Sequence, residues 1–270
     1  MYIPDASAWK TEVGSAVNGQ IDNITGEEAR DASGNVLFNI QTRYIEVANN
    51  TFSGTSMKTI SNTTWDVLRS AEGMFASASL TGWNNNLSAL QQGYCMFYNC
   101  RSFTSFNGSL SALGDGMRMF TNCSALTTVS ITGTMANLWR GTEMFKGCSL
   151  SYTSLNNILN ALPTKNGNVI EITVADSVKD DMVNAGSWEG VSIPAYDSGN
   201  YYEFTHNGWN VRLTSRTGFT LKEEVVEPDD VITEKDLSEA NGNLDDTTSW
   251  NEQFGRNSGI IKVINEVAYN

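Results

Sequence analysis

The chain has 270 residues, of which 40% are hydrophobic and 10% aromatic, so it can form a hydrophobic core and global disorder is not expected. The net charge of −13 and the pI near 4.5 argue against nucleic-acid binding, which needs Lys and Arg to neutralise phosphates. No stretch approaches the roughly 18 apolar residues of a membrane-spanning helix, so no span is expected.

The N-terminal segment, residues 1–50, is expected to cap or dock one end of the repeats that follow. Its first residues, MYIPDASAWKTEV, have neither the basic nor the apolar stretch of a signal peptide, so no export signal is expected. Two strands are predicted after the turn at Gly34, at Val36–Ile40 and Tyr44–Val47.

The central segment, residues 51–163, contains an internal repeat. A Met-Phe dipeptide occurs four times, and Thr51-Phe52 is a degenerate first copy; the Phe residues are Phe52, Phe75, Phe97, Phe120 and Phe145. The steps between them are 23, 22, 23 and 25 residues, which is the length of a leucine-rich repeat. Apolar residues recur ten and seven positions before the later Phe residues, and a Cys follows the last three after three positions.

The clearest copy, from Met119 to Ile131, reads MFTNCSALTTVSI. It resembles the BspA-like leucine-rich repeats, whose signature is similar to MFxxCxxLTxLxLS. The resemblance implies a β-rich leucine-rich-repeat solenoid of five copies, with short parallel strands, few helices and a non-enzymatic binding role. Because one copy buries too little apolar surface to fold alone, the copies should stack their Phe rings in one buried column. Cys100, Cys123 and Cys148 are expected beside that column as free thiols.

One face of the predicted strands should point outward, because side chains alternate along a strand. The outward positions of all four strands hold small, uncharged residues. Such a face could bind a protein or glycan through hydrogen bonds, and the alternative is a solvated face that binds no ligand. The residues predicted to bind are Ser61, Asn84, Asn86, Asn107, Ser130 and Thr132.

Two further segments follow the repeats. Residues 155–163 have helical spacing and end at Pro163, and residues 164–213 are expected to form a C-terminal cap with strands at Val169–Val174 and Trp209–Leu213. Residues 214–270, with a net charge of −7, are interpreted as an acidic linker and an attachment segment. The predicted assembly residues there are Ile260, Ile261, Val263 and Ile264, since so apolar a strand must pair with something.

Signals for catalysis are weak. His206 is the only histidine, and no zinc, nucleotide or serine-hydrolase motif is present. The paired carboxylates at 180–181, 229–230 and 245–246 lie in polar contexts typical of solvated loops. Residues 241–246 hint at calcium but lack the ligand spacing of an EF-hand loop. No cofactor or metal is therefore expected.

Three functional interpretations remain at this point. The first is a bacteriophage virion component, either a decoration, a fibre-associated or a host-binding protein, which would assemble with other protein subunits or as a homo-oligomer. The second is a bacterial surface adhesin or secreted binding protein that contacts a host protein or glycan. An enzyme of unrecognised type is the third.

Overall fold

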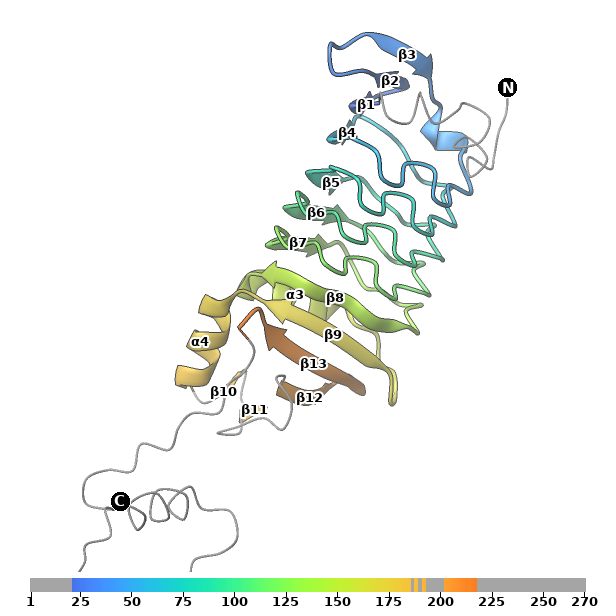
Figure 1. The fold of residues 1–270 in the computed structure, drawn as a ribbon. Coiled ribbons are helices and arrows are strands. Elements are labelled where there is room, and N and C mark those ends of the chain that lie inside the picture. The colour runs from blue at the N-terminus through green and yellow to red at the C-terminus, as the bar shows by residue number, and fades with distance from the viewer. Residues whose placement is uncertain (1–20, 186, 189–190, 193–201, 218–270) are drawn as a thin grey trace, which may run out of the picture. The chain divides into compact units, whose positions relative to one another are not determined.

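The computed structural model describes residues 21–185, 187–188, 191–192 and 202–217 (Figure 1). The chain divides into two units, residues 1–222 and 223–270, and every described residue belongs to the first. No helix in these described stretches is long and apolar enough to cross a membrane.

The described chain begins with a hairpin-like sheet. Strand β1 (Asn23–Thr25) pairs antiparallel with β2 (Glu28–Arg30), which pairs antiparallel with β3 (Val36–Asn39). On its other side β1 pairs parallel with the first repeat strand, β4 (Thr59–Ser61), so that Ile24 lies opposite Ile60. This hairpin therefore covers the edge of the first repeat strand.

The prediction of a strand at Tyr44–Val47 is wrong. Residues Thr42–Tyr44 form the 3-10 helix η1, because the backbone turns there with Tyr44 N–H donating to Gln41 O and Ile45 N–H to Thr42 O, both at 3.1 Å. Val47 makes only an isolated parallel bridge to Ser70. The chain must turn at this point to leave the hairpin and enter the first coil.

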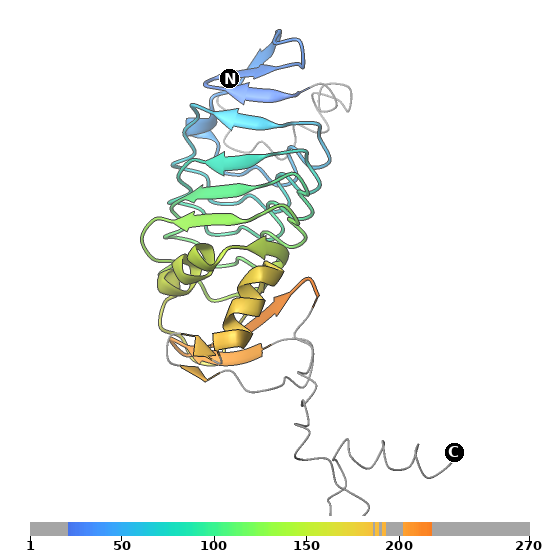
Figure 2. The ribbon, with the colours of Figure 1, turned by 90° about the vertical axis from the view of Figure 1, so that its left-hand side faces the viewer.

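The repeats form stacked coils, here called the repeat stack (residues 45–150). Strands β5 (Gly82–Asn84), β6 (Ser105–Gly108) and β7 (Thr128–Ile131) form one parallel sheet in register (Figure 2). Strand β4 is not part of that ladder. Its coil is joined to the next by Thr81, whose backbone N–H and hydroxyl both bond to Lys58 O at 3.0 Å.

A second line of contacts joins the coils on another side. Isolated parallel bridges link one residue of each coil to the next, through Val47, Ser70, Gln92, Asp115 and Arg140. Beside them, the phenylalanine N–H of each of the first four copies, from Phe52 to Phe120, donates to the Met carbonyl of the following coil, for example Phe97 to Met119 at 2.9 Å.

The core of the repeat stack is the expected aromatic column. Phe75, Phe97, Phe120 and Phe145 are fully buried, and Phe52 is 1% exposed. Successive rings stack with centroids 5.1–5.7 Å apart and planes within 13° of parallel. The prediction of a buried phenylalanine column is confirmed.

The four cysteines are free thiols. Cys100, Cys123 and Cys148 are fully buried, and each thiol donates to the carbonyl of the preceding coil's phenylalanine, at 2.9, 3.0 and 3.3 Å. Burial raises the pKa of Cys100 to about 12 and that of Cys148 still further.

The chain after the repeats covers the last coil with a helix and a sheet. Helix α3 (Tyr152–Ala161) is capped at its N-terminus by Ser151, whose side chain accepts from Ser154 N–H. The helix lies against β7 (Figure 2). The sheet has the order β12-β13-β9-β8, with β8 (Gly141–Leu150), β9 (Val169–Val174), β12 (Tyr202–His206) and β13 (Trp209–Ser215). Helix α4 (Asp176–Ala185) and the short strands β10 (Ser187–Trp188) and β11 (Val191–Ser192) complete this part.

Candidate functional site: a polar strand face and its groove

The outward face of the four repeat strands is polar and accessible to solvent. The side chains between the outward ones, Ile60, Trp83, Phe106 and Val129, are all buried at 6% exposure or less. The six residues predicted to bind are all exposed; they are Ser61, Asn84, Asn86, Asn107, Ser130 and Thr132. The predicted alternation therefore holds, while binding by these residues stays a prediction.

Neighbouring coils are connected across this face by side-chain hydrogen bonds. The Asn107 amide donates to Asn84 Oδ1 at 2.7 Å, and Ser61 Oγ donates to Thr25 Oγ1 at 3.4 Å. Part of the hydrogen-bonding capacity of the face is thus used between coils, and each Asn retains further donor and acceptor positions.

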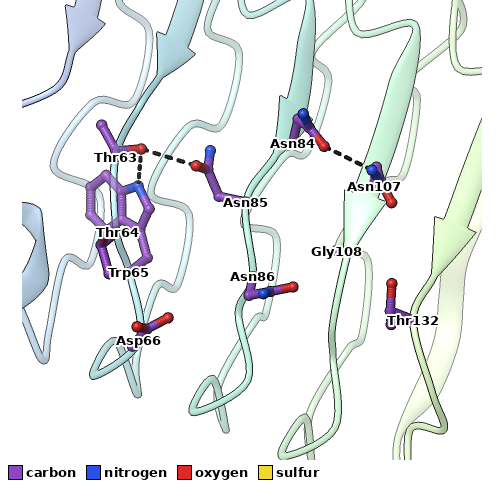
Figure 3. Close-up of a pocket in the computed structure, with 10 residues that line it drawn as sticks. All are labelled: Thr63, Thr64, Trp65, Asp66, Asn84, Asn85, Asn86, Asn107, Gly108 and Thr132. Atoms are coloured by element: carbon purple, nitrogen blue, oxygen red, sulfur yellow. Dashed lines mark hydrogen bonds between the residues drawn. The ribbon is translucent and has the colours of Figure 1, made fainter.

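A groove of about 380 Å³ lies beside this face, where the chain leaves the strands (Figure 3). Four of the six predicted residues line it, namely Asn84, Asn86, Asn107 and Thr132, whereas Ser61 and Ser130 do not. The other lining residues are Thr63, Thr64, Trp65, Asp66, Asn85 and Gly108. Four successive coils contribute to the groove.

Two tryptophans hold the loops of the groove in place. Trp65, which is fully buried, donates its indole N–H to Thr63 Oγ1 at 2.9 Å, and Thr63 in turn donates to Asn85 Oδ1 at 3.3 Å. Trp83, on β5, donates its indole N–H to Asn85 O at 2.8 Å. Both indoles are buried, so they are not available for stacking on a ligand.

Gly108 permits the close approach of two coils. A Cβ atom at this position would lie 2.2 Å from Asn85 O, a distance at which the two coils would have to separate. The Asn86 side chain adds a contact across the same boundary by accepting from Ser109 N–H at 3.2 Å.

Asn85 carries an unsatisfied donor. Its Nδ2 atom is buried and has no hydrogen-bond partner among the described residues. An unsatisfied buried donor costs about 1–3 kcal/mol, so the loop retains an amide group that would gain from meeting an acceptor. Asn85, Asp66 and Thr64 were missed by sequence reasoning, although the run Asn84-Asn85-Asn86 directly after a strand was a visible signal.

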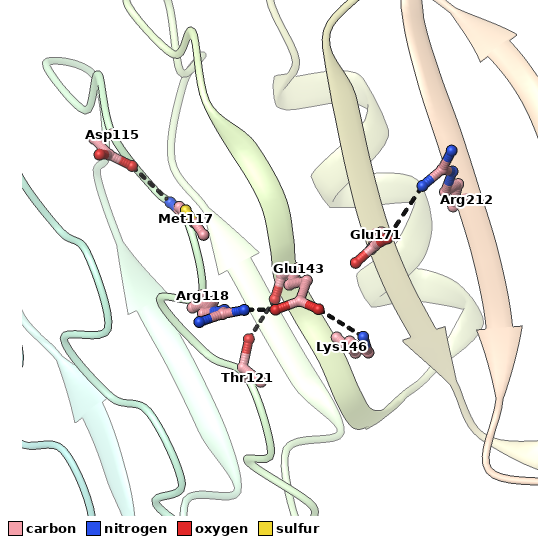
Figure 4. Close-up of polar contacts among 8 residues, drawn as sticks. All are labelled: Asp115, Met117, Arg118, Thr121, Glu143, Lys146, Glu171 and Arg212. Carbon is pink, nitrogen blue, oxygen red and sulfur yellow. Dashed lines mark hydrogen bonds and ion pairs between the residues drawn. The ribbon is translucent and has the colours of Figure 1, made fainter.

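Charged residues concentrate on another part of the molecule (Figure 4). Glu143, on β8, pairs with Arg118 at 2.5 Å and with Lys146 at 2.6 Å, and these hydrogen bonds hold the pKa of Glu143 below its ordinary value. Asp115 is 7% exposed, accepts from Met117 N–H at 2.9 Å and pairs with Arg140 at 3.1 Å. The pairs Arg118–Glu143 and Asp115–Arg140 join one coil to the next, whereas Glu143–Lys146 lies within β8.

Charge pairing continues into the C-terminal sheet. Arg212, on β13, contacts Glu171 of β9 at 3.5 Å and Glu203 of β12 at 2.6 Å. The ion pairs follow the strand order, so their arrangement is that of cross-strand structural pairs rather than a charged site.

The contacts of His206 and Asp180, two of the described residues considered for catalysis, are structural ones. His206 Nε2 lies 3.2 Å from Leu159 O at the end of α3, and Asp180 pairs with Lys179 at 3.2 Å. No group of three His, Cys, Asp or Glu residues with metal-binding geometry occurs among the described residues.

Several predicted features lie outside the described residues. They are the acidic pairs at 229–230 and 245–246, the calcium hypothesis at 241–246, and the assembly residues Ile260, Ile261, Val263 and Ile264.

Stacked coils with short parallel strands and one shared buried column are the architecture of a repeat protein. Residues 45–166 match the family model for a BspA type leucine rich repeat region, in six copies. The resemblance inferred from the Met-Phe motif is confirmed, and residues 45–166 are a BspA-type leucine-rich repeat region. Neither the curated proteins nor the solved structures yielded a match.

The family match starts earlier than the repeats expected from the sequence. It begins at residue 45 rather than 51 and contains six copies rather than five. The bridge from Val47 to Ser70 agrees with this earlier start, because it occupies the same place as the bridges between later coils.

Proposed function

We propose that this chain is a non-enzymatic, adhesin-type binding protein that presents the outer strand face of its leucine-rich repeats to a partner. The observation that carries the proposal is the exposed, uncharged polar side chain at each of the six predicted positions, including Ser61, Asn107 and Ser130. The BspA-type repeat match supports a binding role in general.

The framework of this proposal is a solenoid closed at both ends. The hairpin β1–β3 pairs with β4 at one end, and α3 with β9 covers the last coil at the other. We assign the cap functions to residues 1–50 and 164–213 on this basis, with 51–163 as the solenoid and 214–270 as an attachment segment.

The setting of the protein is the finer part of the proposal. The interpretation drawn from the sequence is a phage virion component, located in the virion; the alternative is a bacterial cell-surface adhesin or a secreted binding protein. The repeat match supports the binding role common to both and adds nothing for the virion. Detecting the protein in purified phage particles, or on cell envelopes alone, separates the two settings.

The test of the binding face uses the full chain, labelled and applied to a printed array of extracellular proteins and oligosaccharides. The variant Asn84→Lys with Ser130→Lys places two positive charges on the face, one of them at a residue that also lines the groove. Its charge-matched control is Gln91→Lys with Ser102→Lys, at two exposed positions away from the repeat strands.

We expect the wild-type chain and the control to bind the same array component, and the face variant to lose that binding. Binding by the face variant at the wild-type level, or no binding by the wild-type chain to any component, would overturn the proposal.

A further inference from the structure

The groove beside the strand face has the chemistry of a site for neutral hydroxyl groups. Apart from the Asp66 carboxylate, its exposed side chains are amides and hydroxyls, with Asn84, Asn86, Asn107 and Thr132 supplied by three successive coils. An Asn amide holds donors and an acceptor in one plane, and a sugar hydroxyl is likewise both donor and acceptor.

Other ligand classes fit the groove poorly. Its only charged lining residue is the carboxylate of Asp66, and no Lys or Arg lines it, so phosphate, sulfate and carboxylate groups would meet no positive charge. A peptide side chain would find no exposed apolar surface there, because Trp65, the one large apolar lining residue, is fully buried.

The loops that line the groove are held in place before any ligand arrives. Trp83 fixes Asn85 O, Gly108 allows the adjoining coil to lie against that carbonyl, and Asn86 bonds to Ser109 N–H. Pre-organised loops reduce the entropy lost on binding.

Asn85 adds an observation that points toward a ligand. Among the residues that the structure describes, its amide nitrogen has no hydrogen-bond partner, and its oxygen accepts one side-chain hydrogen bond, from Thr63, which is long at 3.3 Å. A rotation of this amide toward the groove gives the nitrogen a ligand oxygen to bond.

We propose that the groove binds a neutral oligosaccharide, with the Asp66 carboxylate accepting from sugar hydroxyls and the Asn86 and Asn107 amides bonding to neighbouring ones. The inference rests on the proposed binding function and names the ligand class for that site. Because four coils line the groove, the ligand spans more than one sugar ring. Its binding is insensitive to salt, since no ion pair forms.

The experiment applies the labelled full chain to a printed array of neutral, sialylated and sulfated oligosaccharides, at low and at high salt. Asp66→Ala and Asn107→Ala are the test variants, and Gln91→Ala is the control; all three positions are exposed, so the fold should be retained, and circular dichroism verifies it. The loss of one charge-assisted hydrogen bond in Asp66→Ala should weaken binding by roughly tenfold, and the loss of a neutral hydrogen bond in Asn107→Ala should weaken it by less.

We expect binding to neutral oligosaccharides at both salt concentrations, weakened by either groove substitution and unchanged in the control. Binding only to sialylated or sulfated sugars, or equal binding by the groove variants, would overturn the inference. If the chain binds no saccharide here but binds a protein on the array of extracellular proteins used for the proposed function, the inference fails while the proposed binding function stands. If it binds neither, both fail.

Discussion

At the scale of single residues, the aromatic column concentrates the packing energy of the repeats. Phe120 lies within 5.1–6.1 Å of four other rings, those of Phe97, Phe103, Phe106 and Phe145. Phe52, at the end of the column, stacks on Phe75. The same residue type therefore occupies a central and a terminal position.

We expect Phe120→Ala to lower the free energy of unfolding by about 3–5 kcal/mol, the usual loss for a large aromatic side chain in a core. Phe52→Ala should cost less, because fewer rings lose a partner. Urea unfolding of both variants measures the difference. Equal losses at the two positions would contradict a column whose centre is the most tightly packed part.

The cysteines give a second prediction at this scale. Because burial raises the pKa of Cys100 to about 12 and also raises the pKa of Cys123 and Cys148, almost no reactive thiolate is present at pH 8. The native chain should leave these three thiols unmodified by a disulfide reagent such as DTNB, with at most a slow reaction at the partly buried Cys95.

The matched measurement is the same reaction in denaturant, where all four thiols should react. Fast modification of two or more thiols in the native chain would show that the cysteines are not packed as described.

At the scale of secondary-structure elements, the coils turn at fixed points around Met-Phe. The residues two positions before and two after each phenylalanine have positive φ, between 54° and 74°; they are Asn50, Gly54, Gly73, Ser77, Cys95, Asn99, Arg118, Asn122, Glu143 and Gly147. The last coil keeps this geometry inside β8, which explains the register shifts between β8 and the regular strand β9. One segment thus belongs both to the repeat and to the C-terminal sheet.

Two side chains of helix α3 form hydrogen bonds with backbone groups at the free edge of β7. Ser154 Oγ accepts from Val129 N–H at 2.9 Å and donates to Thr127 O at 2.9 Å. Asn157 Oδ1 accepts from Ile131 N–H at 2.6 Å, and its amide donates to Ile131 O at 3.4 Å. A helix therefore replaces the strand that would otherwise continue the sheet.

We expect Asn157→Ala to destabilise the chain by about 1–3 kcal/mol, because Ile131 N–H loses its acceptor in a largely buried place. The neighbouring Asn156 is the control: its Oδ1 is buried and has no partner in the described part of the chain, so Asn156→Ala should be neutral or stabilising. Thermal or urea unfolding compares the two. A larger loss for Asn156→Ala would show that side-chain capping of the strand edge is not the stabilising factor.

At the scale of the whole molecule, the described fold ends just after β13. Thr217 donates to Asp176 Oδ1 through its N–H at 3.2 Å and through its hydroxyl at 2.9 Å, and it accepts from Lys179 Nζ at 3.0 Å. A truncation intended to preserve the repeats and their C-terminal sheet should therefore retain Thr217.

We expect a chain ending at Thr217 to keep the unfolding transition of the full chain and to lose the assembly assigned to residues 214–270. Light scattering after size exclusion measures the assembly. The full chain with Ile260→Lys and Ile264→Lys is the matched variant, since it keeps the length but disrupts the predicted apolar strand. Unchanged assembly in the truncated chain would contradict the attachment role proposed for residues 214–270.

The sequence by itself determined the repeat and the side of the coil on which each residue lies. Each coil buries the same positions against its neighbours, so a period of 22 to 25 residues was enough to predict the phenylalanine column, the buried cysteines and the exposed Asn84, Asn107 and Ser130. The same logic predicted the α3 helix and the strands β9 and β13 from their apolar spacing and the Pro163 stop.

The tertiary structure alone decided the groove and the ends of the repeat stack. The groove depends on how closely adjacent coils approach, which is set by Gly108 against Asn85 O and by the indole bonds of Trp65 and Trp83, and none of these contacts has a sequence period. The apolar pattern at Tyr44–Val47 suited a strand, and only the turn from the hairpin into the first coil placed Tyr44 at the end of the helix η1 (Thr42–Tyr44) and left the residues after it outside any strand. Repetition specifies contacts that every coil shares, whereas contacts made once depend on the three-dimensional meeting of particular loops.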